Sequence, residues 1–336
     1  MSPIPAESNS SRLCQLLMVL GGMSVEACRN APQDTSTIVV GLADAARPAV
    51  VRVFGRGGLA QPSGSGFYIR GRHGKSLVVT NHHVIWGADD ILIERNDGTT
   101  DTASIVGTDP SSDLALLSPR SNSASNSLSF GDDGSLHQGE WLVCIGSPIG
   151  LLNAMSVGIL SARARVYGAT LAAQKNVDHL FTEAALGPGS SGSPLLDMHG
   201  RVVGINVSIT GSIRGLGVAI PSSLALGIIQ DLELSGQSLH STAGIDVIDR
   251  TDTKSQKSAF WVKSVTPGGP ADLAQFRVGD QIVAVDGKRL LNVSDFQIRV
   301  FLAAPGSTLR VDIVRDGKPL SSTIHVQLVS APDSTP

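Results

Sequence analysis

The stretch Pro188-Gly189-Ser190-Ser191-Gly192-Ser193-Pro194-Leu195 decides how the whole chain is interpreted. It places a serine among small residues in a glycine-rich turn. Glycine lets the backbone turn tightly, so that consecutive N–H groups can point to one place where negative charge develops. A Gly/Ser-rich loop alone is common turn chemistry. The stretch therefore predicts a nucleophilic serine only if a base and an orienting carboxylate occur elsewhere in the chain.

Both groups occur upstream of this stretch. Thr80-Asn81-His82-His83-Val84 follows the apolar run Leu77 to Val79, and Asp113 stands just before another apolar run. From His83 to Asp113 is 30 residues, and from Asp113 to Ser191 is 78. The order His, Asp, Ser is that of the chymotrypsin-like double barrels. The three residues together predict nucleophilic catalysis.

Length and composition limit the other functions. At roughly 150 residues per domain, 336 residues suggest about two domains. Charged residues are 16% of the chain, the net charge is -3 and no basic run occurs, which argues against a nucleic-acid-binding protein. The three cysteines have neither zinc-ligand spacing nor the pattern of a disulfide framework, and Cys144 is interpreted as a small core residue.

The apolar runs between Thr37 and Ile220 are short, β-branched and separated by turn residues. Without helical periodicity between them, they favour an antiparallel sandwich or barrel. They are Val50–Phe54, Leu77–Val79, Ile91–Ile93, Trp141–Ile145, Val157–Leu160 and Val202–Ile205. The first predicted helix runs from Ser223 to Leu234, with Ser222 or Ser223 as its cap and Gly236 at its end. The polar residues 235–242 are interpreted as a linker.

A second, smaller α+β unit is expected over residues 243–330. Phe260–Val265 is predicted to be a strand, and Pro270 to open a short helix. Ser294 and Gln297 have the spacing of a capping box for a helix that ends before Pro305. Two Asp-Gly pairs predict hairpin turns between further strands, at Asp286-Gly287 and Asp316-Gly317.

With these motifs, the chain resembles the HtrA (Deg) serine proteases, which are trypsin-like barrels followed by PDZ domains. The matching stretches are Ser65–Phe67, Thr80–Val84, Asp109–Ala115, Gly146–Gly150, Pro188–Leu195, Gly204–Asn206, Gly215–Pro221, Pro267–Ala271 and Val278–Ile282. The resemblance implies a mainly β fold, with a chymotrypsin-like double β-barrel in residues 35–234, a linker in 235–242 and a small α+β PDZ domain in 243–330.

The resemblance also implies roles for the motif residues. Ser191 is expected to be the nucleophile and His83 the base that takes its proton. Asp113 is expected to hold the correct tautomer of His83 and to stabilise its imidazolium. The backbone N–H groups of Gly189 and Ser191 are expected to form the oxyanion hole. Asp109 is the nearest alternative to Asp113, but a turn or capping role is the better interpretation for it.

Other positions of the resemblance concern specificity and departures from the family. Leu186 and Ile209 match residues that line the primary specificity pocket, which would favour small or medium aliphatic residues before the cut. Ser190 stands where the family usually has Asn, and Ser193 where it usually has a second Gly. His82, beside the expected base, is interpreted as a loop residue. None of the remaining six histidines shares a spacing with carboxylates or cysteines, so no metal site and no cofactor are predicted.

The PDZ resemblance implies that a C-terminal peptide is bound as an added strand. The expected carboxylate-binding loop lies within Ser258–Val262, and the groove is expected between the strand Phe260–Val265 and the helix Ser294–Ala303. The candidate peptide-binding residues are Ala259, Phe260, Trp261, Val262, Phe296 and Val300. The alternative, that such residues form the core of the small domain, is expected to hold for about half of them.

The N-terminal residues 1–30 are interpreted as a signal or lipoprotein leader, or else as an unstructured or amphipathic extension. Leu13–Leu20 is apolar but too short to span a membrane. Val25-Glu26-Ala27-Cys28 loosely resembles a bacterial lipoprotein cleavage box. Export is therefore predicted, to the periplasm or to a membrane through a lipid on Cys28, and a cytoplasmic location is left open.

The favoured function is that of an ATP-independent serine endopeptidase, which degrades misfolded or damaged proteins through an acyl-enzyme. Its expected partners are unfolded proteins or peptides as substrates, C-terminal peptides at the PDZ domain, and two further copies in a homotrimer. No nucleic acid is expected as a partner. The alternative is a peptide-binding chaperone or adaptor with weak or latent proteolysis.

Overall fold

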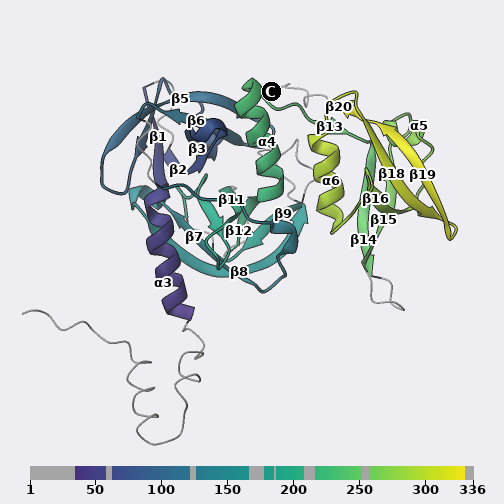
Figure 1. Cartoon of the computed structure of the whole chain (residues 1–336), viewed down its shortest axis with the longest axis horizontal. Coiled ribbons are helices and arrows are strands. Elements are labelled where there is room, and N and C mark those ends of the chain that lie inside the picture. Colours follow the sequence, from purple (N-terminus) through teal and green to yellow (C-terminus); the bar gives the residue numbers. More distant parts are fainter. Residues whose placement is uncertain are drawn as a thin grey trace, which may run out of the picture. The chain divides into compact units, whose positions relative to one another are not determined.

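The computed structural model describes residues 35–57, 63–121, 126–165, 178–184, 187–207, 216–251 and 258–329. The chain divides into two compact units, residues 1–41 and 42–336. The second unit contains two closed six-stranded barrels followed by an open six-stranded sheet (Figure 1). Among the described residues, no helix is long and apolar enough to cross a membrane.

The first barrel has the strand order β1-β2-β3-β6-β5-β4. Its interior is filled by β-branched and aliphatic side chains such as Val53, Val78 and Leu117, because alternate residues of each strand face inward. Its strands are β1 (Val50–Arg56), β2 (Ser63–Arg70), β3 (Ser76–Asn81), β4 (Asp90–Glu94), β5 (Thr100–Asp109) and β6 (Leu114–Pro119). A short 3-10 helix, Arg47–Ala49, leads into β1, and two others connect strands at Arg72–Gly74 and His82–Val84.

The second barrel has the order β10-β11-β12-β9-β8-β7. Its interior contains Leu142, Leu160 and Leu195 together with Cys144, which is buried as expected. The strands are β7 (Trp141–Gly146), β8 (Ala154–Arg165), β9 (Asp178–Thr182), β10 (Pro194–Leu196), β11 (Val202–Val207) and β12 (Gly217–Pro221). Two 3-10 helices, η4 (Asp133–Ser135) and η5 (Pro148–Gly150), precede β7 and β8. The predicted double barrel is confirmed.

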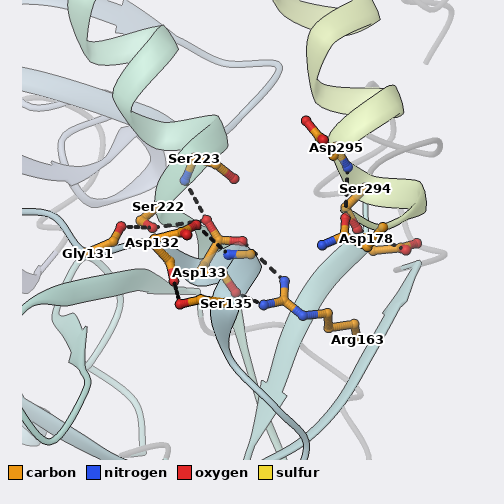
Figure 2. A network of polar contacts seen from close by, with 12 residues as sticks. Gly131, Asp132, Asp133, Ser135, Arg163, Asp178, Ser222, Ser223, Ser294 and Asp295 are labelled. Atoms are coloured by element: carbon orange, nitrogen blue, oxygen red, sulfur yellow. Dashed lines mark hydrogen bonds and ion pairs between the residues drawn. The ribbon is translucent and has the colours of Figure 1, made fainter. Parts of the chain in front are cut away.

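Helix α4 (Ser222–Ser235) follows the second barrel and packs Leu224, Ile228 and Leu232 into the cluster that joins the barrels. Gly236 ends it in the left-handed conformation at φ 79°. The start differs from the expected serine cap. The carboxylate of Asp133 accepts the N–H of Ser223 at 2.7 Å and the hydroxyl of Ser222 at 3.0 Å (Figure 2).

Helix α3 (Thr35–Ala46) was not expected from the sequence. Its first half contains Thr37, Ile38, Val39 and Val40, and β-branched residues lower helix propensity. Its last turns place Leu42, Ala43 and Ala46 in the large apolar cluster of the barrels. This packing compensates for the weak intrinsic propensity.

The C-terminal sheet has the order β14-β15-β16-β18-β19, with β17 paired to β16. Asp286-Gly287 and Asp316-Gly317 both have positive φ, as type I′ hairpin turns require, which confirms the two predicted turns. The strands are β14 (Ile245–Thr251), β15 (Ser258–Val265), β16 (Gln281–Val285), β17 (Lys288–Arg289), β18 (Thr308–Arg315) and β19 (Lys318–His325). A separate pair joins β13 (Ser241–Thr242) to β20 (Gln327–Leu328). Helix α5 spans Pro270–Leu273, and its proline is at the start as predicted.

Helix α6 (Val293–Leu302) corrects the predicted capping box. The cap is Asn292, whose side chain accepts the N–H of Asp295 at 2.8 Å. Ser294 lies inside the first turn, and its hydroxyl donates instead to Asp178 of β9 at 3.0 Å (Figure 2). Gln297 is buried, and the polar atoms of its side chain have no hydrogen-bond partner among the described residues.

Candidate active site

His83 lies on the 3-10 turn that follows β3, next to the turn between β5 and β6. Its Nδ1 lies 2.7 Å from Oδ2 of Asp113, and its backbone N–H donates to Oδ1 of the same carboxylate at 2.9 Å. The side chain of Asp113 is 5% exposed, whereas that of His83 is 38% exposed. The carboxylate therefore fixes both the ring and the backbone of His83 and leaves one edge of the ring accessible.

The backbone of Asp113 has a φ of 57°, in the left-handed region that residues other than glycine seldom adopt. Its carbonyl oxygen accepts the N–H of His82 at 3.0 Å and the side-chain amide of Asn81 at 2.8 Å. Its own N–H donates to the carbonyl of Pro110 at 3.4 Å. These bonds hold a conformation that costs about 1–3 kcal/mol when unsupported.

Ser191 is buried in the glycine-rich turn that precedes β10. Gly189 and Gly192 both have positive φ, at 94° and 83°. The N–H of Ser190 donates to Gly187, and that of Ser193 donates to Ser190. The N–H of Gly189 donates to no partner within the described part of the chain.

The glycine-rich turn of Ser191 packs directly against the first barrel. The N–H of Ser65 donates to the carbonyl of Ser191 at 2.8 Å, and the hydroxyl of Ser65 donates to the carbonyl of Gly189 at 2.8 Å. A Cβ placed on Gly192 would overlap the carbonyl oxygen of Ser65 and lie 2.6 Å from Oγ1 of Thr80. The structure thus joins His83 to Asp113 directly and sets the turn of Ser191 against the strands that lead to His83.

Asn206 of β11 supports the same turn and was missed in the sequence analysis. Its side-chain amide donates to the carbonyl of Ser193 at 3.3 Å, to the hydroxyl of Ser193 at 3.1 Å and to the sulfur of Cys144 at 3.0 Å. Its carbonyl accepts the N–H of Gly192 at 2.9 Å. The hydroxyl of Ser193, where glycine is usual in the family, is therefore accommodated by polar partners. Asn206 is the last residue of the matching stretch Gly204-Ile205-Asn206, and this match was the one sign in the sequence that Asn206 has a role at the site.

His82 differs from His83 in its surroundings. Its Nδ1 is buried and has no hydrogen-bond partner among the described residues. Burial lowers the pKa of His82, and this effect exceeds the opposite effect of the carboxylates of Asp113 and Asp109. Its ring is therefore neutral at pH 7, and the contact with the carboxylate of Asp113 is made by the ring of His83.

Two predicted specificity residues, Leu186 and Ile209, lie outside the described residues, as does Cys28. Asp109, for which a turn role was expected, accepts the N–H of Ser111 at 3.1 Å in such a turn. Within the described ranges, no three His, Cys, Asp or Glu side chains gather closely enough to hold a metal ion.

The structure corrects the strand expected to bind peptides. β15 pairs with β14 along one edge and, at Phe260 and Trp261, with β16 along the other, so no peptide strand can be added beside those residues. Phe260 and Val262 belong to the core of the small domain, as do Phe296 and Val300, and Ala259 is also buried. The alternative interpretation, that such residues form the core of the small domain, therefore describes them better.

Strand β14 lies at the end of the sheet and has one free edge among the described strands. An open groove of ≈ 550 Å³ lies between β14 and α6. The small domain contributes Val247, Ile248, Asp249, Lys263, Asn292, Val293 and Ser294, and the second barrel contributes Arg163, Ala164 and Asp178. Edge strand and groove are the elements that peptide addition needs.

Comparison with known proteins agrees with this arrangement. Residues 64–205 match the family of trypsin-like peptidase domains, and residues 242–326 match the PDZ domains. The serine protease HhoA of Synechocystis is 32% identical over 326 residues, which cover 90% of this chain and 82% of HhoA. The chain belongs to the HtrA family of serine proteases.

Other HtrA proteins are similar over most of the chain. A DegP-like periplasmic serine endoprotease of Pseudomonas fulva is 34% identical over 83% of this chain, which spans 58% of that relative's length. The solved HtrA-type protease AlgW with a tripeptide has a TM-score of 0.65 at 28% identity, covering 88% of this chain and 98% of AlgW. The serine endoprotease of Yersinia pestis has a TM-score of 0.55 at 29% identity, covering 90% and 100%.

Proposed function

We propose that this HtrA protein is a serine endopeptidase that cleaves polypeptides with Ser191, His83 and Asp113. The observation that carries the proposal is the two-point contact of Asp113 with the ring and the backbone of His83, at 2.7 and 2.9 Å, beside the buried glycine-rich turn of Ser191. Membership of a serine protease family supports it independently.

The mechanism follows from the orientation of the imidazole. Because Nδ1 of His83 faces the carboxylate of Asp113, its proton lies there and Nε2 is left to take the hydroxyl proton of Ser191. The serine oxygen attacks the peptide carbonyl, and the amine leaves with the proton that His83 returns. Water, deprotonated by His83, then hydrolyses the acyl-enzyme. The carboxylate of Asp113 stabilises the imidazolium in both steps.

The negative charge of the tetrahedral intermediate requires donors that are already in place. The N–H groups of Gly189 and Ser191 are proposed to supply them, and the unused N–H of Gly189 supports this role. Each such donor lowers the barrier by about 3 kcal/mol. Leu186 and Ile209 are proposed to favour small or medium aliphatic residues before the cut.

The small domain is proposed to bind C-terminal peptides along the free edge of β14, opposite α6, and not along β15. The edge strand and the adjacent groove support this site, and the related AlgW has been solved with a tripeptide and with a decapeptide. The substrates are proposed to be misfolded or damaged proteins, cleaved without ATP by a homotrimer. Export is proposed because several relatives are named as periplasmic.

Labelling with a peptidyl phosphonate that ends in valine tests the function. We expect one covalent adduct, located at Ser191 by mass spectrometry, and none in Ser191→Ala or His83→Ala. His82→Gln is the matched control and should be labelled at nearly the wild-type rate. Folded wild-type protein that forms no adduct would instead support the peptide-binding chaperone or adaptor.

A further inference from the structure

A buried hydrogen bond joins the segment before the PDZ domain to the turn that carries Asp113. Nε2 of His240, between α4 and β13, lies 2.8 Å from Oδ2 of Asp109 at the end of β5. The side chains are only 5% and 3% exposed. The catalytic triad does not use either residue, and a buried carboxylate is retained at considerable cost unless it is fully paired.

Asp109 forms hydrogen bonds within the turn that contains Asp113. Its Oδ1 accepts the N–H of Ser111 at 3.1 Å, and its backbone carbonyl accepts the hydroxyl of Ser112 at 3.5 Å. Asp109 and Leu114 are paired residues at the base of this β5–β6 turn. A change in the rotamer of Asp109 would therefore change the turn that holds Asp113 at its unusual φ of 57°.

His240 is in turn fixed by the PDZ domain. Its ring stacks on Phe301 of α6, with centroids 3.9 Å apart and planes at 11°. Its carbonyl accepts the N–H of Val329, directly beside the β13–β20 pair. Nδ1 is buried without a hydrogen-bond partner among the described residues. A proton there would be an unpaired buried donor, so the proton belongs on Nε2 and is donated to Asp109.

The surrounding backbone leaves little freedom to this contact. The carbonyl of Gly236 accepts the N–H of Thr108 at 3.3 Å, and a Cβ on Gly107 would lie 2.6 Å from that same carbonyl oxygen. On the other side, Ile298 and Phe301 of α6 belong to the apolar cluster that α4 shares with the barrels. Helices α4 and α6 lie side by side (Figure 1).

We propose that Asp109 and His240 are positioning residues for the reaction. His240, stacked on Phe301, holds the carboxylate of Asp109, and Asp109 shapes the turn that aims Asp113 at His83. The segment that leads into the PDZ domain thereby contributes, through the hydrogen bond of His240 to Asp109, to the geometry of the catalytic carboxylate without touching substrate at that site. This inference rests on the proposed triad.

Two substitutions of His240 in the full chain separate its two contacts. His240→Phe keeps a ring for stacking on Phe301 but removes the donor to Asp109. His240→Gln removes the ring but can place an amide N–H close to the position of Nε2. We expect kcat to fall about tenfold in His240→Phe, with KM within twofold, because a fraction of an ångström at the catalytic carboxylate is enough. His240→Gln should recover most of kcat.

The measurement is kcat and KM on a short peptide amide, with kcat divided by the number of sites that react with the phosphonate. This division removes the effect of misfolded protein. Asp109→Asn is the second variant and should also lower kcat with little change in KM. His137→Gln is the control, because the side chain of His137 is exposed and contacts Glu140, not Asp109 or Asp113.

Each outcome decides one of the two proposals. A wild-type chain that forms no adduct at Ser191 overturns the triad and this inference with it. A labelled wild type whose His240→Phe variant has an unchanged kcat per reactive site overturns this inference alone. Equal losses in His240→Phe and His240→Gln would also overturn it, since the hydrogen bond to Asp109 would then not be the cause.

Discussion

Replacing Gly192 with alanine tests how closely the nucleophile turn must pack against the first barrel. Two costs arise from the structure. The residue has φ 83°, which an alanine adopts at a cost of about 1 kcal/mol. Its new Cβ would overlap the carbonyl of Ser65 and lie 2.6 Å from Oγ1 of Thr80. Contacts of this kind normally need about 3.5 Å, so the turn must move by about 1 Å.

A displacement of this size matters more for catalysis than for folding. Ser191 stands directly before Gly192, so a shift of the turn also moves the proposed nucleophile. Reacting groups misplaced by about 1 Å lose roughly 100-fold in rate. We therefore expect Gly192→Ala to lower kcat by about 100-fold or more and to slow phosphonate labelling equally. The Ser65 hydrogen bonds to the turn, to the carbonyls of Gly189 and Ser191, should weaken as well.

Gly200→Ala is the matched control. Gly200 has a similar φ of 76°, but the nearest atom to its new Cβ is 3.9 Å away, on Leu42. The Gly200→Ala variant should lose about 1 kcal/mol of stability, because alanine is strained at a positive φ, and should keep its activity. The assays are kcat on a peptide amide, the labelling rate and thermal unfolding of both variants. A Gly192→Ala enzyme with kcat within threefold of wild type would refute the argument from close packing.

Three further predictions concern buried polar groups. Asp133→Asn should destabilise the protease domain by about 2 kcal/mol in urea unfolding, because the first turn of α4 loses its capping charge; unchanged stability would contradict this. Burial alone would raise the pKa of Asp280, but hydrogen bonds from Arg315 and from a backbone N–H outweigh burial and hold this pKa below its ordinary value. Asp280→Asn should therefore cost about 2 kcal/mol near pH 7 and progressively less below about pH 4, as the wild type loses that stabilisation; urea unfolding of wild type and variant across this pH range is the measurement. His82, whose pKa is lowered from 6.5, stays neutral in the folded state while the unfolded chain takes up a proton. The wild type should thus lose stability as pH falls below 6.5, and His82→Gln should show a flatter dependence of Tm on pH.

The double barrel and the contact of His83 with Asp113 could be predicted from the sequence because local motifs carry both. His83 follows β3 and Asp113 precedes β6, next to strands that the apolar pattern identifies, and the pairing of these two strands in the first barrel brings the two residues together. Helix α4 was predicted with its apolar face and its terminal Gly236, because the 3.6-residue period and the cap lie within one segment.

The features that were missed depend on residues far apart in the chain. The cap of α4 comes from Asp133, 90 residues before Ser223. The contact of His240 with Asp109 spans 131 residues. The choice of β15 as the peptide strand failed because an interior strand and an edge strand have similar local sequences, and only the order of the sheet distinguishes them.

The order of the strands has one more consequence, for a protein proposed to handle unfolded chains. A closed barrel has no exposed backbone edge, so neither barrel offers a template on which an unfolded substrate could extend a sheet. The strand order of the C-terminal sheet ends at β14 and β19, with the two-residue strand β17 beside β16, and β19 begins with Lys318 and Pro319, which discourage pairing. Between these two outer strands, β14 is thus the one better suited to strand addition, and the two closed barrels are protected from pairing with an unfolded substrate.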